Sequence, residues 1–230
     1  MDRIMKSILC IIALLITGFL PAQVSINGGG SMLVGFGNPQ PFGGFHIGVE
    51  VPRDDVVSIF GRYTHHFKKR SILPIPGYLS PTQFDNFGNA IAPPGELYNP
   101  VVDAYPTMNY NIIEGGTRYY LGNGFDYGFA VYGGSSIMLI FNSVKAEYDS
   151  FNEEYYEIDN FNRPDGSIFS IGFGLGGGLK YSFTRVGTLY FDTNISYMIF
   201  AQASQPTVSG DQYSSLIFNF NLGFRKDILW

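Results

Sequence analysis

A strict two-residue alternation in residues 167–183 constrains the fold more than any other feature of this sequence. One parity is large and apolar, and it includes Phe169, Phe173, Leu175 and Tyr181. The opposite parity is small or polar, and its glycines are Gly172, Gly174, Gly176 and Gly178. Because the side chains of a strand point alternately to its two faces, the pattern predicts a strand with one greasy face and one small, polar face.

The same alternation predicts eight strands in total. It is also clear in residues 188–201 and 213–225, and it is weaker in five upstream segments that each end at a cluster of Gly, Pro, Asn or Asp. The eight predicted strands are residues 24–37, 43–51, 56–67, 109–121, 125–147, 167–183, 188–201 and 213–225. An even number of strands places both ends of the sheet on one side.

The connections between these strands alternate in length. Residues 52–55, 122–124 and 184–187 are tight turns, whereas the intervening connections are mostly much longer. The long-side connections are residues 38–42, 68–108, 148–166 and 202–212. Short turns that alternate with longer loops are typical of outer-membrane barrels, and a soluble β-sandwich has no reason to sort its loops in this way. The pattern favours a barrel whose greasy face contacts lipid, and the sandwich remains the alternative.

The first residues predict a secretory signal peptide. Arg3 and Lys6 precede an apolar run at residues 8–19, and the small residue Ala22 follows. The run has 12 residues, whereas a membrane-spanning helix needs about 20, so a retained anchor is the weaker interpretation. We expect residues 1–23 to be the signal peptide and residues 24–230 to be one β-barrel domain.

Cysteine content and charge exclude several kinds of function. Cys10 lies inside the predicted signal peptide, so the mature chain has no disulfide, thiol nucleophile or cysteine metal site. Removing Asp2, Arg3 and Lys6 changes 14 basic and 19 acidic residues to 12 and 18, which gives a net charge of −6. A nucleic-acid partner is not expected for such a chain.

The polar parity predicts charges of both signs inside the barrel. An eight-stranded barrel is just wide enough for side chains to fill it, so inward charges should pair with one another and close the lumen. The residues predicted to form this lumen charge network are His46, Glu50, Arg62, Glu114, Arg118, Lys180, Asp192 and Arg225.

The signal peptide, the eight alternating strands, the sorted loops and the aromatic-rich last strand together resemble the small outer-membrane barrels of the OmpA/OmpX type. The resemblance implies an eight-stranded antiparallel up-and-down transmembrane β-barrel in the outer membrane of a Gram-negative-type cell envelope, with both termini periplasmic. It also implies a monomer that contacts outer-membrane lipids, including lipopolysaccharide, and the outer-membrane insertion machinery.

The end of the chain is similar to the C-terminal signal that such barrels present to that machinery, with one departure. Lys226, Asp227, Ile228 and Leu229 separate Phe224 from Trp230. Either the last strand continues beyond residue 225 or a short tail follows it.

No catalytic, cofactor or metal site is predicted. Adjacent residues of a strand face opposite sides, so His65 and His66 cannot easily grip one metal ion or one substrate atom together. The acidic, aromatic loop at residues 148–166 has carboxylates that could hold a divalent cation, but their spacing matches no calcium-loop motif. It is a candidate for contact with an extracellular or envelope protein through Tyr148, Phe151, Glu153, Glu154, Tyr155 and Tyr156.

The longest connection, residues 68–108, is predicted to be irregular. It contains seven prolines, which exclude a long helix or a central strand. Loops of this length in compact domains are commonly functional or disordered. Lys68, Lys69 and Arg70 at its base could contact lipid phosphates or simply anchor the rim.

These observations favour a structural or surface-interaction barrel that acts through its extracellular loops. One alternative is a narrow channel for small hydrophobic solutes, which needs an internal cavity. Another is a lipid-modifying enzyme, such as a lipid A hydrolase or acyltransferase, which needs a converging Ser, His and acidic residue that the sequence does not supply.

Overall fold

The computed structural model describes residues 23–35, 38–95, 98–159, 165–204 and 215–229. Ten antiparallel strands form in these residues. They are β1 (Val24–Gly35), β2 (Asn38–Pro52), β3 (Val57–Arg70), β4 (Ile75–Pro81), β5 (Val101–Gly122), β6 (Gly128–Tyr148), β7 (Tyr156–Ile158), β8 (Gly166–Phe183), β9 (Gly187–Ala203) and β10 (Leu216–Leu229). None of these described residues belongs to a helix long and apolar enough to cross a membrane.

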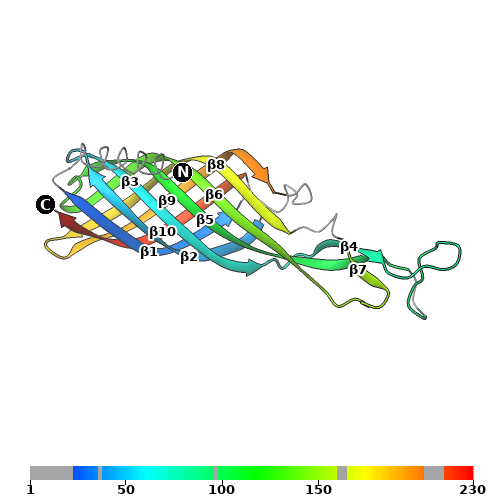
Figure 1. The fold of residues 1–230 in the computed structure, drawn as a ribbon. Helices are drawn as coiled ribbons and strands as arrows, with labels where there is room; N and C mark the ends of the chain where they lie inside the picture. Colours follow the sequence, from blue (N-terminus) through cyan, green and yellow to red (C-terminus); the bar gives the residue numbers. More distant parts are fainter. Residues whose placement is uncertain (1–22, 36–37, 96–97, 160–164, 205–214, 230) are drawn as a thin grey trace, which may run out of the picture.

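Eight of the strands close into a ring (Figure 1). Their order is β3-β2-β1-β10-β9-β8-β6-β5, and pairing of β3 with β5 closes it. The first and last strands are neighbours, with Val24 opposite Leu229. The fold is therefore the predicted all-β, antiparallel up-and-down barrel. Residues 1–22 of the predicted signal peptide, together with residue 230, lie outside the described residues.

The last strand is longer than the alternation predicted. β10 continues to Leu229, and Asp227 and Lys226 pair with Ser25 and Ile26 of β1. Of the two possibilities left open by the sequence, the longer strand is the one observed. Its partner β1 supplies backbone groups along this whole stretch, and this long-range pairing is invisible in local alternation.

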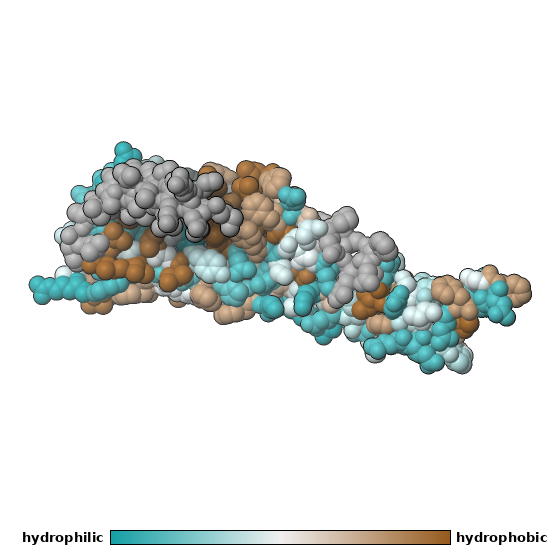
Figure 2. All heavy atoms as spheres, viewed as in Figure 1, coloured by the Kyte–Doolittle hydropathy of each residue, from teal (hydrophilic) through white to brown (hydrophobic). Residues whose placement is uncertain are grey.

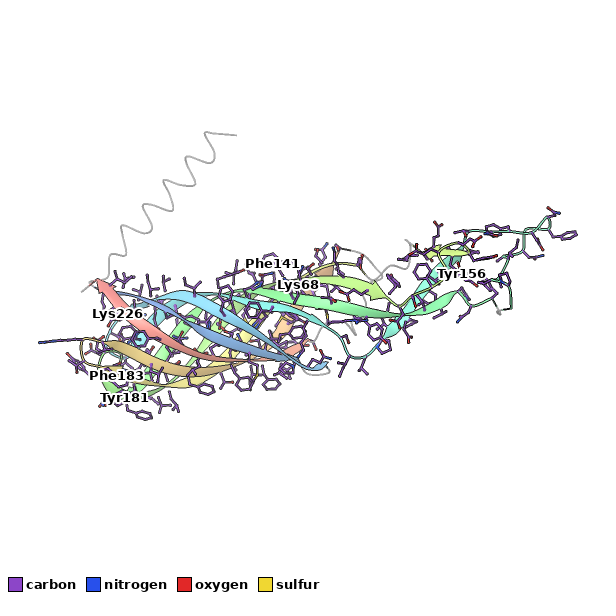
Figure 3. All side chains as sticks on the ribbon, turned by 90° about the horizontal axis from the view of Figure 1, so that it is seen from below. Lys68, Phe141, Tyr156, Tyr181, Phe183 and Lys226 are labelled. Atoms are coloured by element: carbon purple, nitrogen blue, oxygen red, sulfur yellow. The ribbon has the colours of Figure 1, made fainter. Side chains whose placement is uncertain are left out.

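The outer surface of the ring is an apolar belt. Phe173, Leu175 and Leu179 of β8 are exposed on it, whereas Ser170 and Lys180 of the opposite parity are buried. Figure 2 shows hydrophobic residues spread over the barrel wall, with many hydrophilic residues toward the right-hand end, where Figure 1 places β4 and β7. Aromatic pairs mark the edges of the belt. Tyr181 and Phe183 have ring centroids 4.8 Å apart at the end with the short turns, opposite Tyr156 in Figure 3.

At the other end, the sheet continues beyond the ring as an arm, which we define as residues 71–107 and 146–159. β4 pairs with β5 and with β7, and β5 pairs with β6 out to Ala104 and Tyr148 (Figure 1). The prediction that residues 68–108 lack regular structure is therefore wrong for residues 68–70, 75–81 and 101–108, which belong to β3, β4 and β5. The prolines do not prevent strand pairing here. The Pro106 carbonyl still accepts a hydrogen bond from the Ser71 N–H at 2.8 Å, and β4 pairs with segments that are distant in the sequence.

One turn at the opposite, short-turn end also differs from prediction. Residue 125 was expected to begin a strand, but β6 begins at Gly128. The β5–β6 turn instead folds under the ring and puts the Phe125 side chain inside, where it is 1% exposed. Gly124 has a positive φ of 69°, and the Phe125 N–H donates to the Asp55 carbonyl at 2.9 Å. The turn is thereby tied to the neighbouring β2–β3 turn.

Candidate functional site

The lumen brings together all eight residues that the inward parity predicted. None is more than 6% exposed. They come from six of the eight ring strands: His46 and Glu50 from β2, Arg62 from β3, Glu114 and Arg118 from β5, Lys180 from β8, Asp192 from β9 and Arg225 from β10. An antiparallel ring can do this because each strand turns alternate residues inward.

Asp192 is the centre of this network. Its Oδ2 lies 3.0 Å from Arg62 Nη1 and 2.8 Å from Arg118 Nη2. Asn221 Nδ2 also donates to Asp192 Oδ1 at 2.7 Å. Arg62 also pairs with Glu114, which lies directly opposite it on the neighbouring strand β5, and its Nη2 is 2.6 Å from Glu114 Oε2. Two arginines and two carboxylates therefore neutralise one another across the barrel.

Glu50 forms a second centre nearer the short-turn end. It accepts hydrogen bonds from Arg118 Nη1 at 2.8 Å, from the Ser58 hydroxyl at 2.5 Å and from the Tyr120 hydroxyl at 2.5 Å. Arg225 Nη1 lies 3.7 Å from the same carboxylate. A buried carboxylate with this many donors keeps its charge without water.

Lys180 and Arg225 hold the inserted turn. The Lys180 ammonium donates to the carbonyls of Phe125 and Tyr127 at 2.9 and 3.2 Å. Arg225 Nη2 donates to the same Phe125 carbonyl at 2.7 Å, and its guanidinium stacks 3.6 Å from the Phe125 ring centroid. Lys180 differs from Arg62, Arg118 and Arg225, because these three form ion pairs with carboxylates and Lys180 forms none with the described residues. Phe125 thus acts as a plug beneath the charges, which the sequence analysis missed.

The half of the lumen nearer the arm is mainly apolar, with the buried polar side chains of Asn142 and Ser170 among its residues. A buried cluster fills it, made of Leu33, Phe42, Met108, Tyr110, Ile112, Met138, Ile140, Val144, Ile168, Met198 and Ile217. This layer was also missed, but the sequence does carry its signal. Residues 137–141 are apolar without interruption, as expected where a strand contacts lipid on one face and an apolar lumen on the other.

Little space remains between these side chains. A cavity of about 20 Å³ lies beside Arg62, Glu114 and Asn194. Another of about 10 Å³ lies in the apolar layer beside Tyr110 and Met198. A site needs roughly 10–15 Å³ to hold one water molecule. Over the described residues, these lumen cavities are large enough for single waters and too small for a solute.

One Ser–His pair occurs in the lumen. His46 Nδ1 lies 2.9 Å from the Ser31 hydroxyl, but His46 Nε2 is bound to the Tyr190 hydroxyl at 2.5 Å and not to a carboxylate. Both members of the pair are buried, so a lipid at the rim does not reach them. The arrangement lacks the exposed nucleophile and the acidic partner that an acyl-transfer site requires.

The other two histidines point in opposite directions. His66 is fully buried, and His65 lies on the outer surface between Phe45 and Phe67, with ring centroids 5.6 and 5.8 Å away. Among the described residues, no three His, Cys, Asp or Glu side chains come together as a metal site would require.

The predicted interaction residues of the acidic loop all lie on the arm but are not equally accessible. Glu153 and Glu154 are exposed, and Tyr148, Phe151 and Tyr155 are half-buried. Tyr156 is not accessible to a partner as expected, because it is 6% exposed and its ring packs against Tyr98 with centroids 6.0 Å apart. Tyr156 also begins β7, so it serves the internal packing of the arm (Figure 3).

A closed ring with an apolar outer belt and an interior in which buried carboxylates pair with arginines defines a class of protein: the transmembrane β-barrel of the outer-membrane type. No family model matches the sequence, and no curated protein is significantly similar to it.

Solved structures of small outer-membrane barrels are similar to the chain at low identity. A major outer membrane protein of Thermus thermophilus is 12% identical with a TM-score of 0.47, covering 89% of this chain and 99% of that one. OprG of Pseudomonas aeruginosa is 12% identical with a TM-score of 0.47, covering 91% and 97%. Neisserial surface protein A is 11% identical with a TM-score of 0.46, covering 90% and 96%.

Proposed function

We propose that the protein is a structural and surface-interaction barrel of the outer membrane, which acts through its arm and does not conduct solutes through its lumen. The observation that carries the proposal is the filling of the lumen at three levels. The Phe125 plug, the Arg62–Glu114–Asp192–Arg118 network and the apolar layer follow one another along the barrel.

The proposed orientation places the short turns and both termini in the periplasm and the arm outside the cell. Short turns face the periplasm and long loops face outward in barrels of this class. Exposed Lys68 and Lys145, together with Arg70, lie where the arm leaves the wall. This basic collar is suited to the phosphates of lipopolysaccharide. We also propose that the barrel is a monomer inserted by the outer-membrane insertion machinery, and that it is not an enzyme and needs no cofactor.

Conductance tests the proposal directly. We expect the purified barrel to give no stable unitary currents in planar bilayers, because the buried charges pair across the lumen and leave no continuous water path. Reproducible currents whose size changes in the Arg118→Met variant, with an unchanged response in the outward-facing Leu175→Met control, would contradict a closed lumen.

The apolar layer favours one second candidate, a narrow route for small hydrophobic solutes. Met108, Met138 and Met198 supply flexible side chains there. Such a route would admit a radiolabelled hydrophobic solute into liposomes that contain the barrel faster than into protein-free liposomes. Equal entry rates would leave the surface-interaction function as the better account.

A further inference from the structure

The far end of the arm is a small, well-defined turn. The Asp85 carboxylate accepts hydrogen bonds from the N–H groups of Phe87 and Asn89, both at 2.8 Å. The Asp85 N–H donates back to the Asn89 carbonyl at 2.9 Å, and Gly88 adopts a positive φ of 83°. Phe84 and Ala90 form a β-bridge just behind the turn.

This turn presents an aromatic tip to solvent, which we define as Phe84 and Phe87. Phe87 is 91% exposed, and Phe84 is also exposed. The backbone bonds of the turn hold the ring outward, so burying it against a partner costs little ordering of the chain. Aromatic side chains, phenylalanine included, are enriched at protein interfaces, and a preorganised support lowers the cost of binding.

The arm behind the tip is uniformly acidic. Residues 71–107 and 146–159 contain no Lys, Arg or His. The acidic side chains of this region that the structure describes are Asp85, Asp103, Glu147, Asp149, Glu153, Glu154, Glu157 and Asp159. Within the described residues, the ion pair on the arm lies at its base, where Arg70 Nε is 3.5 Å from Glu147 Oε2. The remaining length presents negative charge to whatever approaches the tip.

The tip and the exposed pair Glu153 and Glu154 are held as one unit. The Thr82 hydroxyl and the Gln83 side-chain amide both donate to the Glu154 carbonyl, at 2.7 and 3.2 Å. The Thr82 N–H donates to the Tyr155 carbonyl at 2.9 Å. These bonds fasten the hairpin that carries Phe87 to the turn that carries the glutamates.

We propose that the aromatic tip and the Glu153–Glu154 turn bind a basic protein surface that offers an apolar socket for Phe87. The inference rests on the proposed function and names its partner class. An anionic membrane or lipopolysaccharide layer does not fit, because the carboxylates of the arm would be repelled by it. Complementary charge gives specificity and fast encounter, and the aromatic anchor gives affinity.

A random-peptide phage library, panned on the barrel in lipid nanodiscs, tests this inference. Phage that bind an arm-deleted barrel, in which residues 74–103 and residues 149–158 are each replaced by a Gly-Ser turn, are removed first. We expect the enriched peptides to combine Lys or Arg with aliphatic or aromatic residues. Synthetic copies should bind the wild-type barrel more weakly as salt is raised.

Matched variants locate the contact. Phe87→Ala should weaken binding of the leading peptide roughly tenfold or more, and Phe87→Leu should restore part of it. Glu153→Gln combined with Glu154→Gln should weaken binding and reduce its salt dependence. Tyr127→Ala is the control, because Tyr127 is a comparably exposed aromatic at the opposite end of the barrel. Amide exchange in residues 85–89 reports whether the turn stays intact.

The outcomes separate the two proposals. If binding needs the arm but is unchanged in the Phe87 and glutamate variants, the partner class is wrong and the proposed function stands. If the arm-deleted barrel selects the same peptides, both are wrong. Enrichment of acidic peptides, binding of anionic lipid vesicles to the tip, or association of two copies through their arms in analytical ultracentrifugation would each overturn the basic-partner inference.

Discussion

Arg118 links the two acidic centres of the lumen charge network. Its guanidinium contacts both acidic centres, with Nη1 at 2.8 Å from Glu50 and Nη2 at 2.8 Å from Asp192. It also lies 4.3 Å from the centroid of the Phe60 ring. One side chain thus neutralises two buried carboxylates, which would otherwise lie in a low-dielectric interior with fewer partners.

Replacing this arginine should destabilise the barrel. We expect Arg118→Met to lower the free energy of unfolding by about 3–5 kcal/mol, because it leaves buried negative charge uncompensated. Reversible denaturant unfolding in lipid vesicles measures the effect. Arg53→Met, at an exposed turn position, is the control and should change the stability by less than about 0.5 kcal/mol. Equal losses in the two variants would mean that the network contributes nothing specific.

At the scale of single residues, alternation alone was enough to predict the burial of the charged lumen side chains. Parity is a local property, so Glu114 or Asp192 can be assigned to a face without knowing its neighbours. Partners cannot be assigned in the same way. Lys180 bonds to carbonyls of the inserted turn, and Tyr156 packs against Tyr98 inside the arm. Local alternation could not predict either contact, because the partners are distant in the sequence.

Among the elements, the β5–β6 turn does more than connect two strands. The Phe125 ring fills the short-turn end of the lumen, packs edge-on against Tyr120 with centroids 5.5 Å apart, and lies under Arg225. Its carbonyl binds both Lys180 and Arg225. The turn is therefore part of the packed interior.

Truncating this ring separates packing from closure. We expect Phe125→Ala to cost about 3–5 kcal/mol, the usual range for loss of a buried phenylalanine side chain. The variant should still give no currents in planar bilayers, because the Arg62 and Arg118 ion pairs lie above it. Phe129→Ala, on the lipid-facing surface of β6, is the comparison and leaves the plug in place. Currents in Phe125→Ala alone would show that the plug is the true seal.

The turn at the tip of the arm is a second element, and its stability depends on the Asp85 carboxylate. Hydrogen bonds from the Asn89 side chain and backbone hold the pKa of Asp85 below its ordinary value. Because the pKa is lowered, these bonds stabilise the turn at neutral pH, and the stabilisation disappears as the pH falls through that lowered pKa.

We therefore expect Asp85→Ala to speed amide exchange at Phe87 and Asn89 at neutral pH, while Asp103→Ala leaves it unchanged. In the wild-type protein, the NMR shifts of these amides should keep their turn values as the pH falls through the ordinary titration range of an aspartate, and change only below it. A turn that is equally protected in Asp85→Ala would mean that the β-bridge behind it is sufficient.

The strands themselves show where prediction from the sequence succeeds and stops. Alternation located all eight ring strands, since each of them contacts lipid on one face. It failed for β4, β7 and the outer part of β5, where neither face contacts a membrane and the pairing depends on two loops meeting. It was also weak in β6 around residues 137–141, because the lumen there is apolar as well.

For the whole molecule, the apolar belt sets the position in the bilayer. Phe173 lies near the middle of β8 and is exposed on this belt. Phe173→Arg should lower the free energy of unfolding by about 2–4 kcal/mol, the cost of an arginine near the bilayer midplane. Folding titrations in lipid vesicles measure it, with Phe173→Leu as the control. A loss no larger than that of the control would mean that this surface does not face lipid.

The pairing of β1 with β10 has a consequence for how the chain is made. The two strands that seal the ring come from opposite ends of the described chain, so the seal forms only after every other strand is present. A product that stops before β10 would leave free backbone edges on β1 and β9 in hydrocarbon, where each unpaired group costs several kcal/mol. We therefore expect that a chain without β10 does not insert stably into the membrane, because its ring cannot close.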